Sequence, residues 1–225
     1  MWNINFWTKN NFACADGLRY KSLMTTSRRH TPAPGFSLIE LLVVVALIVI
    51  VIALAGSYGA NRRQETQKQL CADNLQKIYL ALQIYANDYK GGLPRNTNAT
   101  TSEQVLDELV PKYTADTTIF ICPGGRDSLL PSGEPLSRYM ISYAYYMGRR
   151  LDDPQKVLLS DRQVNTEPKR AGEVIFSLNG KPPGNNHSKY GGNFLMADGS
   201  VQASGPQLTF SLAETPGVVL LNPRP

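Results

Sequence analysis

The feature that most constrains this chain is an apolar run near its N-terminus with one carboxylate at its start. Residues 41–55 contain no polar side chain, and Glu40 directly precedes them. As an α-helix, residues 36–60 would be about 37 Å long, which is enough to cross a hydrocarbon core of about 30 Å. Burying a carboxylate at the edge of that core is costly, by a few kcal/mol even on lenient insertion scales. Glu40 therefore predicts a partner charge.

The positive charge of the chain is concentrated before this run. Five of the 23 basic residues but only one of the 18 acidic residues lie within residues 1–35, so most of the net charge of +5 is there. The near-neutral remainder offers no electrostatic footprint for nucleic acid, and we expect no such partner. A basic segment before an apolar helix favours a cytoplasmic N-terminus, although Arg62, Arg63 and Lys68 after the run weaken that asymmetry.

Three kinds of membrane segment fit residues 36–60. A cleaved secretory signal would use Ala-Leu-Ala at residues 53–55 as its small-residue cleavage site. A plain signal anchor is the second kind. Neither explains Glu40, and the run is long for a cleaved signal. The third kind is a membrane helix that begins with a defined motif. The motif here consists of Gly35, Phe36 and Glu40 at a fixed spacing, followed by a long uncharged run.

That third pattern, GFSLIELLVVVALIVIVIALA, resembles the N-terminal signature of type IV prepilins and of the pseudopilins of type II secretion systems. The resemblance implies that a prepilin peptidase cuts between Gly35 and Phe36 and methylates the new amine of Phe36. It also implies an assembly role for Glu40, whose carboxylate would pair with the Phe36 amine of a neighbouring subunit. Two charges that are each costly at the membrane edge become tolerable as a pair.

The function implied by the resemblance is structural rather than enzymatic: a subunit of a type II secretion pseudopilus. Such a subunit spans the bacterial inner membrane once, with its N-terminus in the cytoplasm and its C-terminal domain in the periplasm, and assembles into a filament. Its partners would be the prepilin peptidase, other pseudopilins or pilins, the inner-membrane assembly platform and membrane lipid. Two alternatives stay open: a type IV pilin, and a periplasmic binding or enzymatic domain that uses the same N-terminus only as an anchor.

The sequence predicts four parts: a leader at 1–35, a membrane helix at 36–60, a periplasmic continuation of that helix at 61–90, and a β-rich domain at 91–225. A start at Met24 would give a shorter, basic leader, which is more typical of prepilins. The continuation has an apolar stripe with spacings of three and four residues, as on one face of a helix. Its members are Cys71, Leu75, Ile78, Leu82, Tyr85 and Tyr89.

Because such a stripe must be covered, we predict an α+β, pilin-like fold in which the long N-terminal helix packs on a small antiparallel β-sheet. Residues 101–104 fit a capping box for a short helix that ends at Pro111. Strands are predicted at 117–122, 140–147, 157–160 and 173–178. Residues 193–197 and 200–203 form the strongest hairpin pattern, with Asp198-Gly199 as its turn. The last twenty residues would add an edge strand or lie loose.

Two stretches of this domain region resemble pseudopilin-like proteins of planctomycetes and verrucomicrobia. One is CADNLQKIYLALQIYANDYKGGLP, and the other extends from Asn186-His187 to Ser200-Val201. The spacing from the histidine to Asp-Gly is one residue longer here than is usual in those proteins.

Candidate chemistry is sparse. Cys71 and Cys122 could form a disulfide outside the cytoplasm, or they could be two separate small apolar residues. A calcium site at Asp161 and Asp198 is the one metal hypothesis, by analogy with major pseudopilins. His187 fits a loop residue that hydrogen-bonds a turn better than a ligand. No nucleophile elbow, phosphate loop or zinc spacing of paired cysteines is present in the sequence.

Overall fold

The computed structural model describes residues 35–125, 127, 130–212 and 215–225. The predicted leader, including Met24 and Cys14, lies outside these residues except for Gly35. The chain divides into two compact units, at residues 1–48 and 49–225. Helix α1 (Leu38–Asp88) begins in the first unit and ends in the second. One uninterrupted helix thus includes most of the residues predicted for the membrane helix and for its continuation.

The first part of α1 is long and apolar enough to cross a membrane. Leu38–Ala55 has a mean hydropathy of 3.3, and none of it is buried within the structure. Large apolar side chains from Leu38 to Leu54 are 41% to 79% exposed. Exposed aliphatic surface on this scale is unfavourable in water, so this segment is compatible with a single-pass membrane anchor.

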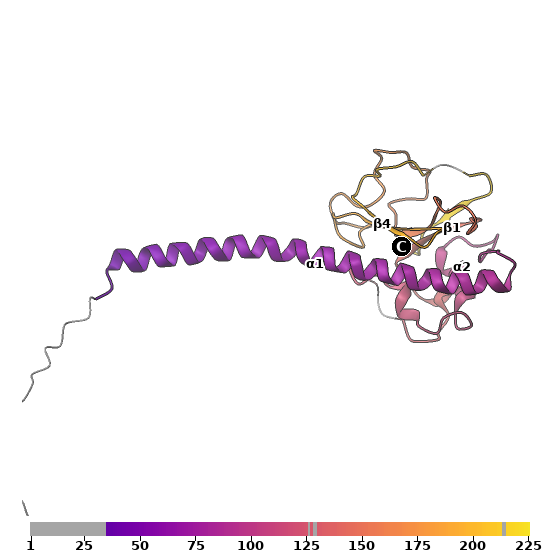
Figure 1. Ribbon diagram of the computed structural model, residues 1–225, viewed down its shortest axis with the longest axis horizontal. Coiled ribbons are helices and arrows are strands. Elements are labelled where there is room, and N and C mark those ends of the chain that lie inside the picture. Colours follow the sequence, from indigo (N-terminus) through magenta and orange to yellow (C-terminus); the bar gives the residue numbers. More distant parts are fainter. Residues whose placement is uncertain (1–34, 126, 128–129, 213–214) are drawn as a thin grey trace, which may run out of the picture. The chain divides into compact units, whose positions relative to one another are not determined.

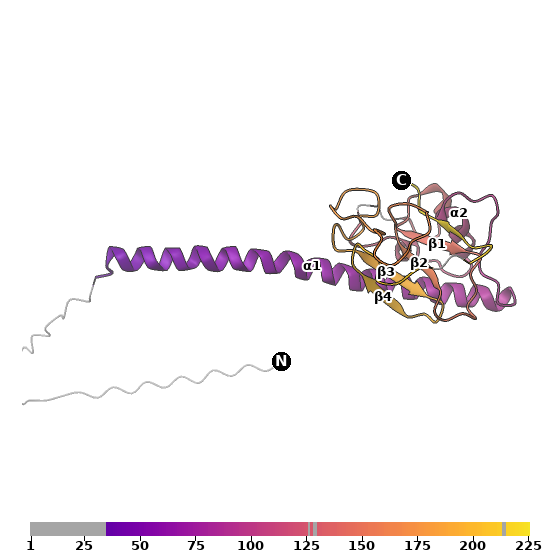
Figure 2. The ribbon, with the colours of Figure 1, turned by 90° about the horizontal axis from the view of Figure 1, so that it is seen from above.

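The C-terminal part of α1 packs on a sheet, as Figures 1 and 2 show. Cys71, Leu75, Ile78 and Leu82 are completely buried, as the stripe predicts. Tyr89 differs: it lies beyond the last residue of α1 and is 54% exposed, although its ring stacks on Tyr85 with centroids 4.2 Å apart. The helix ends because Lys90 and Gly91 adopt positive φ angles of 54° and 85°, which break the helical backbone.

The sheet has five antiparallel strands in the order β4-β3-β2-β1-β5. Their bounds are β1 Tyr143–Met147, β2 Val157–Asp161, β3 Gly192–Met196, β4 Val201–Ser204 and β5 Val219–Leu221. The β3–β4 hairpin turns at Asp198 and Gly199 as predicted. Of the two alternatives left open for the last twenty residues, β5 is the edge strand. The α+β class with an antiparallel sheet is thus confirmed.

Both faces of the sheet are covered. Tyr143, Tyr145 and Leu195 face the core shared with α1, whereas Tyr146 and Phe194 belong to a second cluster with residues of the loops. This alternation follows the two-residue period of a strand. Leu158 and Leu159 both join the first core because the register shifts between Val157 and Leu159.

Two predicted strands are not formed. Residues 117–120 form a 3₁₀ helix, η2 (Thr117–Phe120), because the Asp116 side chain accepts a hydrogen bond from the Thr118 amide at 3.0 Å and caps it. Residues 173–178 contribute only an isolated bridge between Val174 and Gln207. Local capping chemistry thus overrode the β-branched composition of residues 117–122.

The remaining helices are short: α2 (Ser102–Leu106), η1 (Asp107–Leu109) and η3 (Leu136–Arg138). The predicted helix between residues 101 and 111 exists as α2 followed by η1. Its capping box differs in detail, because Thr101 makes no side-chain cap and the side-chain Oε1 of Gln104 accepts a hydrogen bond from the Thr100 amide at 2.8 Å.

Candidate functional site

Two regions carry the candidate functional residues, and the first is the start of α1. Gly35 and Phe36 precede the helix, and both are exposed. Glu40 lies in the first turn of α1 and is also exposed. A carboxylate in the first turn is stabilised by the unpaired amides and the positive end of the helix dipole. The predicted cleavage bond therefore lies in non-helical, accessible backbone just before the helix.

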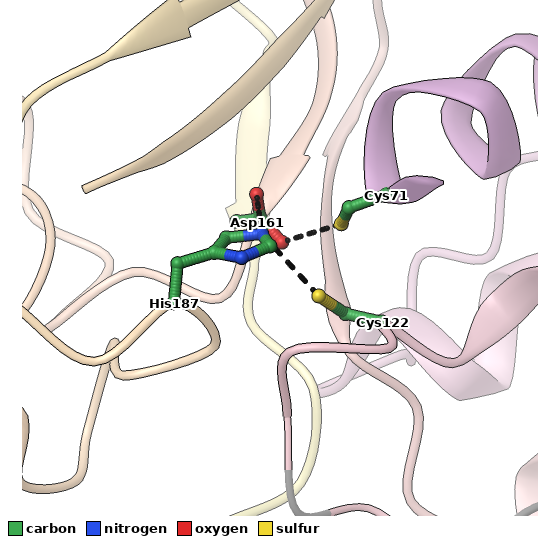
Figure 3. Close-up of side chains that lie close together, drawn as sticks. All are labelled: Cys71, Cys122, Asp161 and His187. Atoms are coloured by element: carbon green, nitrogen blue, oxygen red, sulfur yellow. Dashed lines mark hydrogen bonds and ion pairs between the residues drawn. The ribbon is translucent and has the colours of Figure 1, made fainter. Parts of the chain in front are cut away.

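The second region is a buried cluster of four side chains from distant parts of the sequence: Cys71, Cys122, Asp161 and His187 (Figure 3). Cys71 projects from α1, Cys122 follows η2, Asp161 is the last residue of β2, and His187 lies in the loop before β3. Each is at most 1% exposed. Their potential ligand atoms all lie within 4.8 Å of one another.

Asp161 is the centre of this cluster. Its Oδ1 accepts the Cys71 thiol at 3.2 Å, and its Oδ2 lies 3.3 Å from His187 Nε2. Two amide groups complete its environment, because Asn186 Nδ2 donates to Oδ1 and the Asn193 amide donates to Oδ2, both at 2.7 Å. Four partners for one carboxylate explain how an ionised aspartate can be fully buried.

The charges of the cluster are set by this geometry. Burial would raise the pKa of Asp161, but the facing His187 and the hydrogen bonds outweigh it and lower the pKa below its usual value. Burial would likewise lower the pKa of His187, but Asp161 raises it to about 10. Burial is also the main cause that raises the pKa of Cys71, well above the usual thiol value. The resulting state is an Asp161 carboxylate, a His187 imidazolium and a Cys71 thiol.

The backbone leaves room for the cluster only because two glycines flank it. A Cβ at Gly124 would lie 2.7 Å from His187 Nδ1, and a Cβ at Gly192 would lie 2.9 Å from Asp161 Cβ. Cys122 is in turn held by its amide, which donates to Ser142 Oγ at 2.9 Å. These contacts hold the four side chains in one place.

The arrangement differs from that of a cysteine-histidine-aspartate catalytic triad. Cys122 Sγ lies 3.3 Å from His187 Nε2, and Asp161 Oδ2 lies 3.3 Å from the same nitrogen. In a triad the nucleophile and the carboxylate use opposite ring nitrogens, so that the imidazole can relay a proton. Here Nδ1 is buried and has no hydrogen-bond partner among the described residues. The thiols are also inaccessible to a substrate.

The structure does not bring the two predicted calcium ligands together. Asp198 is exposed in the hairpin turn, where its Oδ1 accepts the Ser200 amide at 2.8 Å. Asp161 is instead buried, and its carboxylate accepts the amide of Asn193 in β3, five residues before Asp198 in the sequence. The donors around Asp161 are two sulfurs and a nitrogen, whereas calcium requires oxygen.

Cys71 and Cys122 are free thiols in the structure, buried side by side in the cluster. The sequence pointed to each residue type separately, but it contained no spacing that linked them. The sequence contained one signal for this cluster, which was a polar or reactive side chain next to apolar residues. Asp161 ends an apolar strand, and Cys71 lies in the apolar stripe of α1.

Comparison with known proteins adds no identification. No family model, no curated protein and no solved structure matches this chain.

Proposed function

We propose that this chain is a filament-forming membrane subunit of the pseudopilin type, in which α1 is both anchor and assembly element. The observation that carries the proposal is the position of Glu40 in the first turn of α1, near the start of the exposed apolar segment Leu38–Ala55. In the membrane, aliphatic side chains could face either lipid or neighbouring helices at little cost. Glu40 cannot, because it needs a cation.

Cleavage before Phe36 would create that cation. The new amine of Phe36 would lie four residues before Glu40, at the same membrane depth. Glu40 of one subunit would accept the Phe36 amine of another, and this pair would determine the axial register of the filament. The folded domain would be carried outside the cytoplasm, and the chain would be a substrate of the prepilin peptidase. Secretion pseudopilus is the use we favour over type IV pilus.

The decisive experiment separates processing from assembly. Glu40→Ala should be cleaved and methylated at Phe36 like the wild type, as read by mass spectrometry of the mature N-terminus, but should be lost from sheared or cross-linked filaments. Glu65→Ala is the matched control, since Glu65 is exposed on the same helix beyond the apolar run. If Glu40→Ala and Glu65→Ala assemble equally well, the pairing is wrong. If the wild type stays monomeric beside its assembly machinery, the filament function is wrong.

A second function has one specific observation in its favour. An open groove of about 390 Å³ lies on the face of the domain formed by β1, β5 and neighbouring loops, and Arg149 and Lys169 are among its lining residues. Glu167 also lines the groove, 4.0 Å from the Lys169 ammonium, so this mixture of charged and apolar side chains would suit a membrane-anchored domain that binds a small polar ligand. Under that alternative, Glu40→Ala would leave all measurable function intact, and substitution of Lys169 would remove binding.

A further inference from the structure

The donor atoms of the buried cluster have the chemistry of a zinc site. Cys71 and Cys122 supply sulfur, His187 supplies an imidazole nitrogen and Asp161 supplies a carboxylate oxygen. Zinc accepts all three donor types, and structural zinc sites are most often closed by four of them. Calcium and magnesium would be excluded by the two sulfurs.

The geometry agrees with this chemistry. In a tetrahedral site with zinc–ligand bonds of about 2.0 to 2.3 Å, neighbouring donor atoms are about 3.3 to 3.8 Å apart. In the cluster the separations are 3.2 Å from Cys71 Sγ to Asp161 Oδ1, and 3.3 Å from His187 Nε2 to both Cys122 Sγ and Asp161 Oδ2. All four donors are within 4.8 Å of one another. Small side-chain shifts would therefore complete the site.

The surroundings are also those of a ligand set. Tyr143 Oη lies 3.1 Å from Cys71 Sγ, where its hydroxyl can donate to a thiolate. Asn186 and the Asn193 amide orient the Asp161 carboxylate, each at 2.7 Å. Hydrogen-bond donors around bound ligands hold their orientation and reduce the charge of an anionic site.

We propose that Cys71, Cys122, Asp161 and His187 bind one zinc ion, which fastens α1 to the sheet and the loop before β3. Binding requires both cysteines as thiolates and His187 as a neutral imidazole, so the protons that these three groups carry in the metal-free protein are released to solvent. With four protein ligands and no solvent access, no position is open for water or substrate, and the role is structural. The proposal concerns the folded domain alone and is independent of filament assembly.

The test uses the full chain in detergent, with Cys14→Ser so that only the two clustered thiols remain. Under reducing conditions, titration with Co²⁺ should saturate at one equivalent. It should give the intense visible bands of tetrahedral cobalt and a thiolate-to-cobalt charge-transfer band. Zn²⁺ should remove both signals, whereas Ca²⁺ should leave them. Elemental analysis of protein isolated from zinc-supplied cells should find one zinc per chain.

Variants identify the ligands. Cys122→Ser and His187→Gln should lose the tetrahedral spectrum, and Asn186→Ala should weaken zinc binding about 10- to 100-fold through the orientation of Asp161. Asp198→Asn, in the exposed turn, is the control and should bind like the wild type. The wild-type spectrum does not depend on whether a variant folds.

Two results would overturn the proposal. One is an octahedral cobalt spectrum, or none, from the reduced wild type. The other is protein isolated from cells without zinc and with a Cys71–Cys122 disulfide in its peptide map. The disulfide consumes both sulfur ligands, so it and the zinc site exclude each other.

Discussion

Replacement of Asp161 by asparagine tests the physical account of the buried cluster in its metal-free form. The side chains have nearly the same shape, so the change removes charge and acceptor capacity without creating a cavity. Asp161 accepts from Asn186 on one oxygen and from the Asn193 amide on the other, and it faces His187 at 3.3 Å. An asparagine can accept only on its single oxygen, and its NH₂ group would then face another donor.

The expected cost follows from those contacts. Loss of one hydrogen bond to a charged group costs about 1.5 to 3 kcal/mol, and a buried donor without an acceptor costs about 1 to 3 kcal/mol more. The sum agrees with the range of about 3 to 5 kcal/mol for breaking a buried ion pair by removing one partner. We expect Asp161→Asn to lower the free energy of unfolding by about 3 to 5 kcal/mol.

The assay is urea unfolding of the full chain in detergent, with reductant and chelator present and tertiary structure followed by near-ultraviolet circular dichroism. Asp198→Asn is the matched control, since its exposed side chain can still accept the Ser200 amide through its oxygen. The control should leave the free energy of unfolding close to that of the wild type. If Asp161→Asn costs no more than this control, the buried carboxylate does not stabilise the fold and the reasoning fails.

Three further predictions address the core, the space around the cluster and the dependence on pH. Leu82→Ala, at a fully buried site of α1, should cost about 2 to 5 kcal/mol in urea unfolding, whereas Leu80→Ala, at a site 57% exposed, should cost well under 1 kcal/mol. Similar losses at the two sites would contradict the assigned buried face. Gly124→Ala should lower the free energy of unfolding by about 1 to 3 kcal/mol, because its Cβ would lie 2.7 Å from His187 Nδ1. An unchanged urea midpoint would show that the His187 ring has room to move. Burial raises the pKa of Tyr146 to about 12, above its ordinary value of about 10, so its stabilising contribution is present below pH 10 and is lost as pH rises towards 12. The alkaline fall in stability should therefore be shallower in Tyr146→Phe, and an equal fall in both proteins would contradict this.

Prediction from sequence was most successful for elements with a local period. The three- and four-residue spacing of Leu75, Ile78 and Leu82 identified the buried face of α1, and Asp198-Gly199 identified the β3–β4 turn. Prediction was wrong for residues 117–120, where a side-chain cap from Asp116 outweighed strand propensity. It also missed that His187, assigned to a loop turn, is fully buried against Asp161.

What the sequence by itself determined is the apolar segment at the start of α1, the one carboxylate in that segment (Glu40), and the helix and strand periods of the domain. Each of these depends on neighbours within one or two turns of chain, which a linear pattern records. The cluster was decided only by tertiary structure. Cys71, Cys122, Asp161 and His187 belong to four separate segments, and no residue spacing encodes their meeting. They converge because α1, which carries Cys71, packs on the sheet. Asp161 at the end of β2 and His187 in the loop between β2 and β3 then lie next to that cysteine.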